Sequence, residues 1–147
     1  MVQKLIVVTT LILATVTYVD AVAHSGAKGI VKERMDYFKA SSSNLKKIRA
    51  HISNENYKSI IPLAKSIASW STKMPDYFPT GSNINPSEAS PKIWSDFEGF
   101  KEAAQLNWKA TISLANAAEI GDRDAVIKAF KDTAASCKSC HKIYRLK

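Results

Sequence analysis

The chain has 147 residues and a formal net charge of +8, from 21 Lys and Arg residues against 13 Asp and Glu residues. This length suits one domain with a modest hydrophobic core, and the sequence shows no internal repeat or second domain. Apart from the adjacent His141, the two cysteines have no nearby metal-ligand partners, because His24 and His51 lie far from them in the sequence. The chain therefore lacks the four closely spaced ligands of a structural zinc site.

The first 23 residues have the pattern of a secretory signal peptide. Lys4 supplies a positive charge, residues 5–19 are mostly apolar, and Ala21 and Ala23 form an A-x-A cleavage site. The alternative is an uncleaved membrane anchor, but a bilayer span needs about 20 apolar residues and four threonines dilute this run. We predict cleavage after Ala23, a mature domain of residues 24–147, and no stable membrane span after cleavage.

The predicted mature chain keeps the net charge of +8, because the leader contains one Lys and one Asp. A basic surface is typical of nucleic-acid binding, but export to the periplasm argues against a nucleic-acid partner. Docking to an acidic protein, or adhesion to an anionic membrane surface, agrees better with export. A well-solvated surface is the simpler explanation for most of the lysines. Five lysines fall on the last predicted helix or just after it and could orient an acidic partner: Lys128, Lys131, Lys138, Lys142 and Lys147.

Apolar residues recur at spacings of three and four along residues 29–52, which predicts a first helix. A similar pattern predicts a second helix over residues 54–73, with Ser53 as its N-cap. Pro62 lies too deep for the first turn of that helix, so we expect a kink or a late start there. The apolar stripe of the first helix includes Val31, Met35, Phe38, Leu45 and Ile52.

Four prolines and a glycine predict a loop over residues 74–91. A third helix is predicted over residues 93–119 and a fourth over residues 124–144, with Gly121 as a stop signal and Asp122 as an N-cap. Short connections make neighbouring helices antiparallel. The sequence therefore predicts an all-α fold, an antiparallel up-down four-helix bundle. The predicted inward face of the third helix includes Trp94, Phe97, Phe100, Ala104, Trp108 and Ile112.

The fourth predicted helix contains the most informative motif, Cys-Lys-Ser-Cys-His at residues 137–141. Residues three apart on a helix share a face, so Cys137 and Cys140 can both reach one edge of a flat ring. Two such cysteines followed directly by histidine form the attachment motif of a c-type haem, which is bound through thioethers. His141 then offers an imidazole nitrogen to the iron. We predict one haem c, covalently attached through Cys137 and Cys140 near the C-terminal helix.

A Cys-x-x-Cys pair can also be a redox dithiol, half of a zinc site or a disulfide. A thioredoxin-like dithiol opens a helix after a strand, whereas residues 124–136 predict a helix. A disulfide across so short a loop stabilises a chain little. The adjacent histidine and the predicted export favour haem attachment. In an oxidising compartment, thiols are either paired in a disulfide or covalently attached to a cofactor.

Four segments together resemble the cytochrome c′ family, the class II c-type cytochromes with their low-spin relatives. Residues 135–145 (ASCKSCHKIYR) resemble its C-terminal motif, and residues 30–35 (IVKERM) its first-helix motif. Residues 75–82 (PDYFPTGS) and 91–94 (PKIW) resemble its loop and the start of its third helix. The resemblance covers essentially the whole mature chain. Class I cytochromes c carry the attachment motif near the N-terminus and do not fit.

The resemblance implies that the residue four positions after Arg34 faces the distal side of the iron. That residue is Phe38, which cannot coordinate a metal. The resemblance therefore implies a five-coordinate, high-spin haem with a crowded distal pocket that admits only a small gas. The alternative is a six-coordinate, low-spin cytochrome with Met35 as distal ligand, because Met35 lies near the same helix face. Met35 can equally pack in the core.

Further residues enter the predicted haem site through the resemblance. Arg34 resembles the family's arginine beside a haem propionate, where a guanidinium can pair with a carboxylate. Arg145 lies one helical turn after His141, near the proximal face. Glu88 is a weaker candidate for the haem surround. Phe78 and Trp94 are also weaker candidates, with core packing as the simpler role.

The predicted function is that of a periplasmic c-type haem protein and not of an enzyme. Its role is one-electron transfer, reversible binding of NO or CO, or both. Peroxidase-like catalysis ranks last, because the sequence places Phe38 and no histidine on the distal side. The predicted partners are an acidic redox protein or a small gas. Many proteins of the resembled family are homodimers, so a homodimer is a candidate assembly.

Overall fold

The computed structural model describes residues 26–146 of the chain. The predicted signal peptide and its cleavage site lie outside the described residues. Within residues 26–146, no helix combines the length and the apolar character that crossing a bilayer requires.

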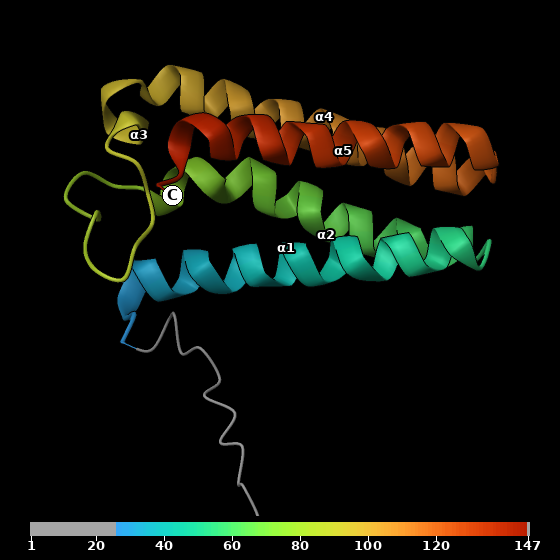
Figure 1. The fold of residues 1–147 in the computed structure, drawn as a ribbon, viewed down its shortest axis with the longest axis horizontal. Helices are drawn as coiled ribbons and strands as arrows, with labels where there is room; N and C mark the ends of the chain where they lie inside the picture. The colour runs from blue at the N-terminus through green and yellow to red at the C-terminus, as the bar shows by residue number, and fades with distance from the viewer. Residues whose placement is uncertain (1–25, 147) are drawn as a thin grey trace, which may run out of the picture.

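Four long helices form the bundle: α1 (Gly29–Ser53), α2 (Ile60–Lys73), α4 (Phe97–Ile120) and α5 (Arg123–Tyr144). They lie lengthwise beside one another, and the loop with the short helix α3 (Lys92–Ser95) gathers at the end where the C-terminus lies (Figure 1). Helix α4 packs along both α2 and α5, and α1 packs on α2. Helices α1 and α5 hardly touch. The predicted all-α four-helix bundle is confirmed.

The turn between α4 and α5 follows the predicted signals. Gly121 adopts a left-handed conformation with φ 81°, which glycine reaches without steric cost. The carboxylate of Asp122 then accepts hydrogen bonds from the backbone N–H groups of Asp124 and Ala125, at 2.9 and 3.0 Å. These bonds satisfy two donors that the first turn of a helix leaves free.

The start of the second helix differs from the prediction. Ser53 is the last residue of α1 and not an N-cap, and α2 begins only at Ile60, after a 3₁₀ turn over Tyr57–Ser59. This late start puts Pro62 in the first turn of α2, where its missing N–H costs no hydrogen bond. The expected late start is therefore confirmed, and the predicted N-cap is wrong.

The predicted third helix is interrupted. Asp96, with φ −143° and ψ 56°, separates α3 from α4. The inward face of α4 is also shifted from the prediction, since Asn107 and Thr111 are buried whereas Trp108 and Ile112 are only half-buried. The predicted stripe followed the apolar residues, but the two buried polar side chains are hydrogen-bonded within the bundle.

Candidate functional site

A cavity of about 410 Å³ opens between α1 and α5, at the end of the bundle that carries the loop. It lies where these two helices hardly touch. Of the ten candidates from the sequence, the structure leaves Trp94 outside the lining of this cavity and brings Phe78 to it together with the eight main candidates. The eight main candidates are Arg34, Met35, Phe38, Glu88, Cys137, Cys140, His141 and Arg145.

The two cysteines line the cavity from α5 as free thiols. Burial raises the pKa of Cys140 to about 11. Burial also raises the pKa of Cys137, and the hydrogen bond from Asn107 opposes this rise. Both groups are therefore protonated thiols at neutral pH. Because thiolates are the metal-binding form of cysteine, this environment disfavours direct metal ligation by either sulfur.

His141 and Phe38 face each other across the cavity. Their ring centroids are 6.4 Å apart, with an angle of 69° between the ring planes. Since carbon atoms in contact lie about 3.5–4.0 Å apart, a flat group between them would need about 7–8 Å, so at least one of the two side chains has to shift to admit it. Burial, and next the charge of Arg145, lowers the pKa of His141. The imidazole is thus neutral near pH 7, with a lone pair free for a metal.

Arg34 is a buried cation on the cavity wall, with 2% of its surface exposed. Its guanidinium donates to the carbonyl of Tyr77 (3.1 Å) and to the hydroxyl and carbonyl of Ser82 (2.8 and 2.7 Å). It also donates to the hydroxyl of Ser87 (2.7 Å) and lies 4.4 Å from the ring centroid of Phe78. Burial lowers its pKa. Among the described residues these acceptors are all neutral, so Arg34 keeps an uncompensated charge beside the cavity.

Glu88 and Arg145 form an ion pair at the rim of the cavity. The Arg145 Nε donates to a carboxylate oxygen of Glu88 at 2.7 Å. Both side chains are about half exposed, so the pair alone contributes little stability. The backbone reinforces it, because Ala89 and Arg145 form an antiparallel bridge and Leu146 N–H donates to the Glu88 carbonyl at 2.8 Å. The loop is therefore held against the end of α5.

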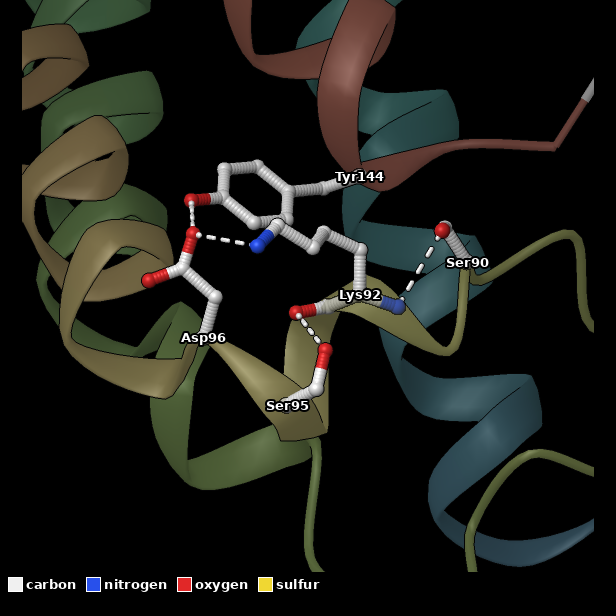
Figure 2. Close-up of polar contacts among 5 residues, drawn as sticks. All are labelled: Ser90, Lys92, Ser95, Asp96 and Tyr144. Atoms are coloured by element: carbon white, nitrogen blue, oxygen red, sulfur yellow. Dashed lines mark hydrogen bonds and ion pairs between the residues drawn. The ribbon is translucent and has the colours of Figure 1, made fainter.

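Tyr144 ties the same end of α5 to α3. Its hydroxyl donates to a carboxylate oxygen of Asp96 at 3.1 Å, and Lys92 Nζ approaches that oxygen at 3.4 Å (Figure 2). Burial and the neighbouring Asp96 raise the pKa of Tyr144 to about 12. The bond from Tyr144 in turn lowers the pKa of Asp96. These contacts fix α5 one turn beyond His141. We call Tyr144, Arg145 and Leu146 the C-terminal anchor.

Trp70 and Asn107 are among the cavity residues that the sequence did not assign to the site. Trp70 is 3% exposed, stacks on Tyr37 with centroids 4.6 Å apart, and its indole nitrogen has no hydrogen-bond partner among the described residues. Asn107 contacts Cys137 through a hydrogen bond of 3.2 Å. The position of Asn107, three residues after Ala104 on the inward face, was the signal that could have identified it.

Comparisons of the sequence with protein families and with known proteins find the same family. A family model described as Cytochrome C' matches residues 29–145. Cytochrome c' from Rhodospirillum rubrum is 33% identical over 149 residues, covering 97% of this chain and 98% of the relative.

Solved structures agree with this match. Cytochrome c' from Thermochromatium tepidum aligns with a TM-score of 0.74 and 27% identity, covering 80% of this chain and 95% of that one. A nitric oxide complex of a cytochrome c prime mutant from Alcaligenes xylosoxidans aligns with a TM-score of 0.72 and 29% identity, covering 80% and 94%.

Proposed function

Because the chain belongs to the cytochrome c′ family, we propose that it is a periplasmic haem protein with five-coordinate, high-spin iron. The family carries covalent haem c, and residues 137–141 of this chain contain the attachment motif. When bound, the haem supplies one-electron redox chemistry and a coordination position for a diatomic gas.

The residues of the cavity fit such a group. The cavity is lined mainly by apolar side chains, two free thiols share one face of α5, and a neutral imidazole follows them. The buried charge of Arg34 has only neutral partners among the described residues, so a haem propionate would compensate it. We assign Cys137 and Cys140 to attachment, His141 to the proximal position and Arg34 to the propionate.

The position of Phe38 is the observation that carries the proposed coordination state. Its ring faces His141 across 6.4 Å and packs edge-on against Trp70, with centroids 5.3 Å apart. A phenyl ring has no lone pair for a metal, and with a haem bound this ring would crowd the side opposite His141. Phe38 therefore excludes large ligands and must move aside for a small gas.

The second candidate is a low-spin electron-transfer cytochrome with Met35 as distal ligand. Met35 also lines the cavity, three residues before Phe38 on α1. For its sulfur to replace the ring opposite His141, α1 would have to rotate, and this rotation would also displace the buried bonds of Arg34. The geometry therefore favours Phe38 as the residue opposite His141.

We propose reversible binding of NO or CO, together with one-electron transfer, as the role of this site. The nitric oxide complex of the Alcaligenes xylosoxidans mutant supports gas binding. The net charge of +8 supports docking of an acidic redox protein. No turnover chemistry is proposed, since Phe38 lacks the acid or base that a peroxidase needs opposite the proximal ligand.

Absorption spectra of the ferrous protein with and without CO test this function. A five-coordinate iron takes up CO directly, so the spectrum should change at once on mixing and titrate to one CO per chain. A ferrous spectrum that does not change when CO is added would contradict gas binding. If Met35→Leu then restored CO binding, Met35 would be the distal ligand.

A further inference from the structure

A buried polar network joins α2, α4 and α5 at the wall of the cavity. Asn107, on α4, is 7% exposed. Its Oδ1 accepts a hydrogen bond from Ser71 Oγ at 2.6 Å, and its Nδ2 donates to Ser136 Oγ at 2.8 Å and to Cys137 Sγ at 3.2 Å. A buried amide without partners would be costly, and here each of its three hydrogen-bonding groups has one.

The network fixes which way the amide points. Ser136 donates its own hydroxyl proton to the carbonyl of Thr133 at 2.7 Å, so it can only accept from Asn107. The nitrogen of the amide must therefore face Ser136 and Cys137. The oxygen then faces Ser71, whose single hydroxyl proton lies nearer to Asn107 Oδ1 (2.6 Å) than to the Ile67 carbonyl (3.0 Å) by donor–acceptor distance. The hydrogen bonds to the neighbouring serines therefore orient the Asn107 amide so that one of its N–H groups points at the Cys137 sulfur.

Attachment of haem preserves this contact. It adds the S–H of a cysteine across a carbon–carbon double bond, so C–S and C–H bonds form while the S–H bond and the π bond break. The sulfur loses its proton but keeps its lone pairs, and it can still accept a hydrogen bond. Among the described residues, no hydrogen bond is made to Cys140 Sγ. Cys137 Sγ therefore accepts a hydrogen bond, whereas Cys140 Sγ accepts none from these residues.

We propose that Asn107 is a positioning residue that orients the Cys137 sulfur for attachment and then donates a hydrogen bond to the finished thioether. Such a bond draws electron density from the sulfur and hence from the ring that carries it. It favours the more electron-rich ferrous state, because hydrogen bonds near a haem are one means by which a protein sets its potential. This inference rests on the attached haem and not on the coordination state proposed above.

The variant Asn107→Leu, in the haem-loaded protein, removes the donor and keeps the number and branching of the side-chain heavy atoms. Two controls match it. Thr111→Val removes a buried hydroxyl of α4 that bonds only to carbonyls of its own helix, and Ser136→Ala loosens the network but leaves the bond to sulfur. The number of thioether bonds, from mass spectrometry of haem peptides, and the reduction potential are measured for each variant.

The proposal expects a lower reduction potential for Asn107→Leu and a fraction of chains attached through Cys140 alone. Both controls should keep two thioether bonds and the wild-type potential. An Asn107→Leu protein with complete attachment and an unchanged potential would overturn the proposal, whatever its thermal stability. Equal potential shifts in Asn107→Leu and Ser136→Ala would also overturn it, because the effect would then belong to the network and not to the sulfur bond. Should Asn107→Leu fail to fold, Asn107→Ala removes the donor without adding atoms. The reduction potential and the number of thioether bonds of Asn107→Ala then test the proposal in the same way.

Discussion

The two ends of the bundle are packed by different kinds of side chain. At one end, an aliphatic cluster that includes Ile48, Ile60, Leu114 and Val126 is fully buried. At the other end, an aromatic cluster of Trp70, Phe78, Phe100 and Tyr144, with smaller apolar neighbours, surrounds the cavity. Small aliphatic residues let helices approach closely and fill space completely. The large rings at the other end line a cavity beside α1 and α5.

The two ends are also held by different forces. The aliphatic cluster depends on burial of apolar surface, whereas the cavity end depends on polar contacts from the loop. Arg34 binds the loop through Ser82 and Ser87, and the C-terminal anchor binds it through Glu88. The comparison implies that changes at the aliphatic cluster affect stability alone, while changes around the cavity affect the haem. The predictions below test this separation.

The largest effect is expected from replacing both attachment cysteines by alanine. Without a thioether, acid-acetone should extract all haem from the variant, whereas the wild-type protein should keep its colour. Hydrogen exchange should also become faster around Trp70 and Phe100 than around Leu114, because only the cavity end loses packing. Lys138→Ala, between the two cysteines, is the control and should retain haem. Colour kept by the double variant would refute covalent attachment.

The next effect concerns the aliphatic cluster. Leu114 is completely buried, so Leu114→Ala should lower the free energy of unfolding by about 2–5 kcal/mol through lost contacts and a new cavity. Chemical denaturation followed by circular dichroism measures this loss. The haem spectrum should stay unchanged, and a shifted spectrum would show that the two ends are coupled.

A smaller free-energy effect, on the barrier to CO association, is expected from removing the Phe38 ring from the cavity. Phe38→Ala should speed CO association by about tenfold, equivalent to about 1.4 kcal/mol of barrier, because the ring no longer has to move. Flash photolysis or stopped-flow mixing gives the rate. Met35→Leu, which changes another cavity residue of α1, should leave it nearly the same. A wild-type rate in Phe38→Ala would remove Phe38 from this role.

The smallest effect is expected at the C-terminal anchor. Tyr144→Phe removes the hydrogen bond to Asp96, so the thermal midpoint should fall by a few degrees near neutral pH.

This difference should depend on pH in a defined way. The raised pKa of Tyr144 means that its contribution is complete below the ordinary tyrosine value of 10.0 and is lost as the pH rises through about 12. The lowered pKa of Asp96 means that its share is complete above 3.8 and is lost at lower pH. A difference that stays constant from pH 3 to pH 12 would contradict this assignment.

Sequence periodicity predicted the four long helices well, because each has an apolar stripe and clear end signals such as Gly121 and Asp122. The prediction from periodicity failed where contacts between distant segments determine the structure more than the local sequence does. The break at Asp96 depends on contacts with Tyr144, almost fifty residues later. Likewise, the burial of Asn107 depends on partners from α2 and α5.

The attachment motif itself was predictable because its three functional residues are adjacent in the sequence. The resemblance added Arg34, Phe38 and Arg145, and the structure brings all three to the same cavity. It could not reveal that Arg145 pairs with Glu88, or that Arg34 binds the loop, because these contacts depend on the path of residues 74–91. Their roles toward haem remain predictions.

Electron paramagnetic resonance of the ferric protein, as isolated at neutral pH, tests the central claim most directly. With Phe38 opposite His141, the account predicts an axial high-spin signal from five-coordinate iron, in the wild-type protein and in Met35→Leu alike. A low-spin signal in the wild-type protein that becomes high-spin in Met35→Leu would contradict the account and identify Met35 as the sixth ligand.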